Sequence, residues 1–176
     1  YLVASLPMLR FDEDPPISLE AFLQACEQNL GSREYHLVRT LAEGEVGAIR
    51  QESSFLAAWY GFTLRMKSSL HEKRAKALMR TEEAEHTSLD TDIHGEEVVK
   101  EALQAENPLE AELILMRYYW DVAQRLSQMK VFSLEVLFTY AIQLALLERK
   151  ALFTPMEGNA EFRRLFSNLQ SIIKSI

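Results

Sequence analysis

Apolar side chains recur along most of this chain at steps of three and four residues, the spacing of one face of a helix. The first such stretch follows Ser18, a suitable N-cap, and ends at Gly31. A second short helix is expected to be capped by Ser32 and to close near Gly44. Before them, residues 1–8 (YLVASLPM) form an apolar run that predicts a short strand or an extended arm packed on the core.

The longest expected element is a helix over residues 51–80, where no proline interrupts the chain. Its first half is aromatic and apolar and its second half is amphipathic and basic, so one end should leave the core. Asn107, Pro108 and Glu110 are typical of a helix start, as a cap, a first-turn proline and an acid at the third position. The helix after them carries a stripe of Leu109, Leu113, Met116, Trp120 and Ala123.

A mostly apolar run at residues 131–147, opened by Ser133, resembles a membrane span in composition. Because it is at the short end of spanning lengths and contains Glu135 and Gln143, a central buried helix is the better interpretation. A last amphipathic helix is expected to restart at Thr154 and Pro155. We therefore predict an all-α bundle of about five to seven helices, with one long helix and a short extended N-terminal arm.

Composition agrees with this pattern. The chain has 176 residues, 48% of them apolar, which is enough for one domain (1–176) with a sizeable core. Six glycines and five prolines are few for a protein of many short strands. The lone Cys26 excludes an internal disulfide and favours a reducing, cytoplasmic location. No signal peptide is visible, but the chain starts at Tyr1 without a methionine, as expected for a trimmed piece, so that absence carries little weight.

Charge is distributed unevenly. Lys and Arg number 19 and Asp and Glu 26, giving a net charge of −7. Residues 81–112 contain eleven acids and one base, so they carry −10 and the rest of the chain +3. Residues 65–80, in contrast, contain six bases and one acid. Because the negative segment adjoins the basic one and no binding motif is present, nucleic acid is not an expected partner.

The acidic segment contains the strongest candidate for metal chemistry. Residues 81–95 lack apolar periodicity and predict a flexible, solvated connector. Its possible ligands are Glu82, Glu83, Glu85, His86, Asp90, Asp92 and His94. Glu83 and His86 have the i, i+3 spacing of carboxylate-bridged metal bundles, but the second such motif is missing and the neighbours are polar. A metal-dependent helical enzyme therefore stays open only as an alternative.

Other catalytic constellations find little support. Cys26 lies on an apolar helix face, where it packs as a small hydrophobe. His36 and His71 are isolated in the sequence. There is no glycine-rich phosphate loop, no G-x-S-x-G motif and no H-E-x-x-H motif. We therefore predict no catalytic, cofactor or metal residues, and no enzymatic activity.

Three sequence blocks, in order, are similar to a known family. They are residues 55–78 (FLAAWYGFTLRMKSSLHEKRAKAL), 107–126 (NPLEAELILMRYYWDVAQRL) and 132–149 (FSLEVLFTYAIQLALLER), together with the opening YLVASLP. This combination resembles the uncharacterised proteins encoded beside the subunits of prokaryotic V-type ATPases. The resemblance implies association with other V-type ATPase subunits and an all-helical shape similar to the C/d component of the stalk. It also implies a non-catalytic accessory or stalk-type role, in the cytoplasm or peripheral to the membrane.

Charged residues within these blocks and beside them are the candidate interface. They are Arg65, Arg74, Glu110, Glu112, Arg117, Glu148 and Arg149. Since they interrupt apolar helices, they should lie at the margin of the core, where buried charges need partners. Pairing among them would fix the helix register, whereas outward-facing members would bind another subunit. A generic helical scaffold stays open as an alternative, as does a homodimer through the C-terminal apolar face that includes Phe162, Phe166 and Ile173.

Overall fold

The computed structural model describes residues 1–79, 93–128, 130 and 133–153. These residues form eight α-helices and no strand, which confirms the all-α prediction. The helices are α1 (Leu2–Ser5), α2 (Leu19–Asn29), α3 (Ser32–Ala42), α4 (Val46–Ile49), α5 (Ser54–Met79), α6 (Ile93–Gln104), α7 (Pro108–Leu126) and α8 (Leu134–Ala151). Two of them, α1 and α4, are single turns of four residues. The six longer helices build the bundle.

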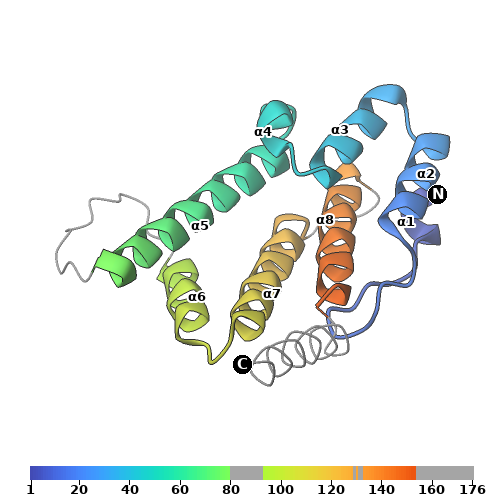
Figure 1. Cartoon of the computed structure of the whole chain (residues 1–176). Helices are drawn as coiled ribbons and strands as arrows, with labels where there is room; N and C mark the ends of the chain where they lie inside the picture. The colour runs from blue at the N-terminus through green and yellow to red at the C-terminus, as the bar shows by residue number, and fades with distance from the viewer. Residues whose placement is uncertain (80–92, 129, 131–132, 154–176) are drawn as a thin grey trace, which may run out of the picture.

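Helix α8 lies between two groups of helices (Figure 1). It packs against α7 on one side and against α2 and α3 on the other, while α6 lies along α7. Helix α5, with 26 residues the longest of the described helices, runs past α4, α6 and α7. Half of α8 is buried, nine of its 18 residues, as expected for a central helix. No helix in the described part of the chain is long and apolar enough to cross a bilayer.

All eight helices contribute to one apolar cluster. The largest of its fully buried side chains are Phe22, Cys26, Val38, Leu56, Val99, Phe138 and Leu144. A second, smaller cluster joins Phe11, Met116, Trp120 and Leu147. Phe11 belongs to the segment between α1 and α2, so the smaller cluster fastens that segment onto α7 and α8.

Two helix starts follow the sequence signals closely. The hydroxyl of Ser18 accepts the Ala21 N–H at 3.1 Å and caps α2. The Asn107 side chain accepts the Glu110 N–H at 2.9 Å and caps α7, with Pro108 as its first residue. Helix α8 begins after Ser133, as predicted, although the Ser133 side chain makes no capping hydrogen bond.

Other expectations need correction. Residues 2–5 form a helical turn rather than a strand or fully extended arm, because Leu2 is buried and the Ser5 hydroxyl closes the turn on the Leu2 carbonyl at 2.8 Å. Gly31, not Ser32, is the N-cap of α3. Leu109, expected on the core stripe of α7, is 37% exposed because it lies in the first turn, outside the main helix contacts.

The expected connector also differs where the structure describes it. Residues 93–95 form the first turn of α6 and are not part of a connector. The acidic composition of this segment had indicated a connector and not a helix. Val98, Val99 and Ala102 bury the face of α6 that packs toward α7, so three small apolar residues stabilise an otherwise polar helix. The remainder of the connector (81–92) and the expected C-terminal helix lie outside the described residues.

Candidate interaction surface

Two of the predicted charges join α7 to α8. Glu112 Oε1 lies 2.6 Å from Arg149 Nη2, so the expected pairing across core helices is present here. Tyr119 lies nearby, and its pKa is raised by burial and then by the Glu112 carboxylate, whereas Arg149 lowers it. This pair links α7 to α8, so both charges have a partner within the molecule.

Arg117 binds the segment that precedes α2. Its Nη2 lies 2.6 Å from Asp12 Oδ1, and its guanidinium carbon lies 4.2 Å from the centre of the Phe11 ring. Lys150 approaches the same ring at 5.1 Å and donates to the Phe11 carbonyl. Trp120 meets the Phe11 ring edge-to-face at 5.6 Å. Arg117 thus fastens the N-terminal segment, and its partner is Asp12 rather than one of the predicted acids.

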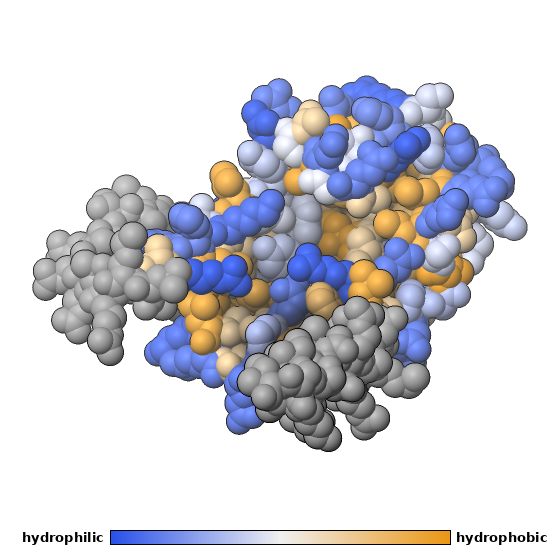
Figure 2. All heavy atoms as spheres, in the orientation of Figure 1, coloured by the Kyte–Doolittle hydropathy of each residue, from blue (hydrophilic) through white to orange (hydrophobic). Residues whose placement is uncertain are grey.

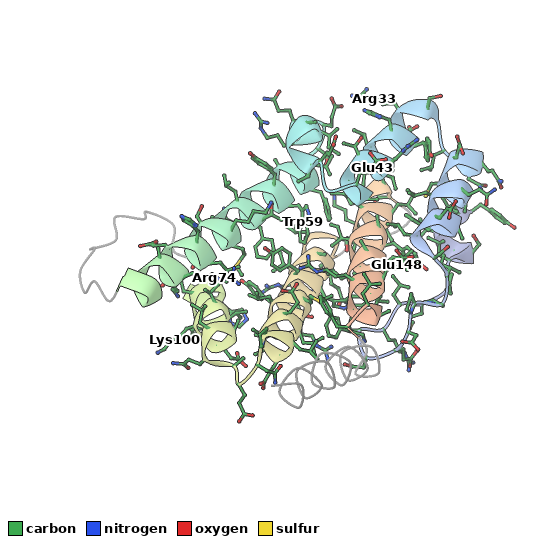
Figure 3. The ribbon with its side chains drawn as sticks, in the orientation of Figure 1. Arg33, Glu43, Trp59, Arg74, Lys100 and Glu148 are labelled. Carbon is green, nitrogen blue, oxygen red and sulfur yellow. The ribbon has the colours of Figure 1, made fainter. Side chains whose placement is uncertain are left out.

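Two predicted acids act at helix starts. Glu148 Oε1 accepts the backbone N–H of Leu19 at 2.6 Å, so its carboxylate lies at the positive end of α2. Figure 3 shows Glu148 on the side of α8 that faces α2. Glu110 Oε2 accepts the Glu106 N–H at 3.2 Å and completes the capping arrangement of α7. Each acid therefore has a hydrogen-bond donor within the molecule, although Glu110 is exposed.

Arg65 and Arg74, both on α5, remain exposed, and neither forms an ion pair with another described residue. Arg74 lies near the far end of α5, beside α6 (Figure 3). Arg65 lies further back along α5 and borders a hollow of about 350 Å³ between α5 and α7, which we call the α5–α7 groove. The groove is lined by Ala57, Ala58, Gly61, Phe62 and Arg65 from α5 and by Tyr118, Val122, Arg125 and Leu126 from α7.

The groove forms because large side chains hold α5 and α7 apart. Trp59 meets Tyr119 edge-to-face at 5.8 Å between ring centres, and Phe62 meets the same ring at 4.9 Å. Trp59 lies between α5 and α7 in Figure 3. Because the neighbouring α5 positions 57, 58 and 61 carry only alanine and glycine, they cannot fill the space beside these large rings. Figure 2 shows apolar residues around a hollow near the middle of one face, where α5, α7 and α8 come together.

A larger hollow of about 550 Å³ lies between α6, α7 and the end of α8. Its two bases, Arg117 and Lys150, already bind Asp12 and the Phe11 carbonyl. Two acids, Glu101 and Asp121, border it as well. Its charges are therefore mixed and partly occupied, which makes it a weaker candidate for docking than the α5–α7 groove.

The residues considered for catalysis do not come together in the described structure. Burial raises the pKa of Cys26 to about 11, so its thiol is unreactive near neutral pH. His36 and His71 are exposed on separate helices. His94 belongs to α6 and packs edge-to-face on Tyr118 at 5.2 Å, while the rest of the predicted metal cluster lies outside the described residues. Among described residues, no three His, Cys, Asp or Glu side chains are grouped as metal ligands.

Arg125 is the site residue that the sequence reasoning missed. It lies on α7, two turns after Tyr118, and its guanidinium carbon is 5.8 Å from the centre of the Tyr118 ring. The small residues Ala57, Ala58 and Gly61 were also missed, although their spacing on an otherwise aromatic helix indicates a face open to close approach.

Comparison with protein families, curated proteins and solved structures finds no match for this chain.

Proposed function

We propose that this protein is a non-catalytic accessory or stalk-type subunit, or an assembly factor, that docks onto other subunits of a V-type ATPase. The proposal is carried by the ordered sequence blocks 55–78, 107–126 and 132–149. These blocks correspond to α5, α7 and most of α8, three helices that contribute to the core, and the first two of them border the α5–α7 groove. The resemblance therefore covers the packed part of the molecule rather than its surface loops.

The groove gives this proposal a physical site for docking. Protein interfaces combine a desolvated apolar centre with aromatic side chains and arginine, whereas acids and lysine are depleted there. The α5–α7 groove has an apolar floor, two aromatic residues and two arginines, and no lysine or acid lines it. A helix lying in such a groove is a common mode of protein recognition.

The test is purification of the tagged full chain from its native membranes, at low and at moderate salt, with identification of the bound proteins by mass spectrometry. We expect ATPase stalk or rotor subunits in stoichiometric amounts, reduced at higher salt because exposed charge contacts are screened. As the control, the native ATPase and its assembly intermediates are purified through a tagged ATPase subunit and searched for this protein. Absence of this protein from every ATPase complex and intermediate would overturn the proposal.

A further inference from the structure

Two guanidinium groups from different helices border the same apolar groove. Five of the described arginines have a carboxylate partner: Arg10, Arg33, Arg39, Arg117 and Arg149. Arg65 and Arg125, one on each wall of the α5–α7 groove, form no ion pair with a described residue. Asp121 lies one turn before Arg125 on α7 and does not pair with it. The charged lining of this groove is therefore purely cationic.

Both arginines are positioned by the groove itself. A Cβ placed on Gly61 would be in ordinary van der Waals contact with Arg65 Nη1, at 3.4 Å, so the Arg65 guanidinium lies back along α5 beside Gly61. The Arg125 guanidinium lies 5.8 Å above the Tyr118 ring, where the aromatic face attracts it. Holding the two groups beside the floor reduces the entropy that a bound partner would have to remove.

Arg65 and Arg125 are both exposed, so a partner that covers the groove together with its rims removes water from the two guanidiniums. Desolvation of an unpaired charge is strongly unfavourable, so a purely apolar segment would bind poorly. A carboxylate offsets this cost best, since it accepts paired N–H donors from a guanidinium. Small side chains at positions 57, 58 and 61 let a second backbone come close to α5.

We propose that the α5–α7 groove binds a helix of a partner protein that presents Asp or Glu between Arg65 and Arg125 and small apolar residues toward Ala57, Ala58 and Gly61. This inference rests on the proposed docking function and names the chemistry of the partner. The acidic residue supplies specificity by pairing with the two guanidiniums, and contacts with the more accessible apolar lining, Ala57, Ala58 and Leu126, supply the buried area.

The probe is a displayed library of short amphipathic helices whose central polar position is Glu, Gln or Lys, selected against the folded full chain. We expect enrichment of Glu over Gln and Lys. For a selected peptide, Arg65→Gln and Arg125→Gln should each weaken binding about tenfold, because each removes a charged hydrogen-bond donor. Arg74→Gln removes the same charge from the same helix outside the groove and should leave the affinity unchanged.

A second pair of variants tests the groove without changing charge. Ala58→Leu fills the groove and should abolish binding, while Ala21→Leu adds the same side chain at another exposed helical position and should not. Circular dichroism and thermal unfolding confirm that each variant is folded. Enrichment of Lys or Gln peptides, equal loss with Arg74→Gln, or full binding to Ala58→Leu would overturn the proposal. So would sedimentation showing a dimer that Ala58→Leu dissociates, because the occupant would then be a second copy.

The two proposals fail in different ways. If ATPase subunits are still recovered with the Arg65→Gln, Arg125→Gln double variant, docking uses another surface and this inference is wrong while the function stands. If acidic helices bind the groove but the unaltered protein recovers no part of the ATPase, the groove chemistry stands and the ATPase assignment is wrong.

Discussion

Replacement of Phe11 by leucine should loosen the attachment of the segment between α1 and α2. Phe11 is only 7% exposed and lies against Trp120, Arg117 and Lys150. Leucine keeps an apolar side chain in the smaller cluster but removes the ring that both cations and the indole contact. The substitution therefore isolates the aromatic contribution from simple burial.

The magnitude follows from the three contacts. A cation over an aromatic ring contributes about 0.5–1 kcal/mol at a partly exposed site. The edge-to-face ring pair contributes about 0.5–1.5 kcal/mol beyond its buried area. With both cations and Trp120, the expected loss in free energy of unfolding is about 1.5–3.5 kcal/mol. Phe11→Ala, which also leaves a cavity, should cost about 3–5 kcal/mol.

The assay is denaturant unfolding of the full chain, followed by far-ultraviolet circular dichroism and tryptophan fluorescence, since Trp120 reports on the contact directly. We expect the denaturant midpoint of Phe11→Leu to fall, and a separate thermal unfolding experiment to show a melting temperature lower by about 3–14 °C. A double-mutant cycle with Arg117→Met should give a coupling of about 0.5–1 kcal/mol. A loss below about 0.5 kcal/mol for Phe11→Leu, the range of ordinary surface changes, would refute the reasoning.

Three further predictions concern single contacts. Glu148→Ala should destabilise the protein by about 1–2 kcal/mol in denaturant unfolding, because alanine removes the hydrogen bond to the Leu19 N–H. Glu148→Gln should cost about half as much, because glutamine keeps that hydrogen bond and removes only the negative charge at the start of α2. Equal effects of the two variants would contradict this account. Cys26 should resist alkylation near neutral pH until the chain is unfolded, because burial raises the pKa of its thiol to about 11. Mass spectrometry measures the labelling, and rapid modification of the folded protein would contradict this prediction. Burial raises the pKa of Tyr140 from 10.0 to about 12. The free energy of unfolding should therefore be unaffected by this group below pH 10 and should fall as the pH rises from 10 toward 12, because the unfolded state loses the proton first. Tyr140→Phe should flatten that part of the pH dependence measured by denaturant unfolding.

The class of the fold and several helix boundaries could be predicted from local features of the chain. Ser18 and Asn107 cap α2 and α7 because short polar side chains satisfy the first free N–H groups locally, with no need of a distant partner. The mostly apolar run of α8 indicated a central position because a helix that is apolar on most sides must be covered on most sides. These properties depend on neighbours within one or two turns, so the sequence alone contains them.

Which charged side chains have partners, in contrast, depends on how the helices pack. Glu112 and Arg149 pair as the sequence reasoning allowed, but Arg117 pairs with Asp12, 105 positions away, and Glu148 with the Leu19 N–H, 129 positions away. Helix α6 is stabilised by three small apolar residues that pack against α7, although the acidic composition of its first turn indicated a connector. Arg125 joins Arg65 in one groove because bulky rings keep α5 and α7 apart beside residues too small to fill the space. Such arrangements depend on the relative placement of whole helices, which no periodicity within a single helix specifies.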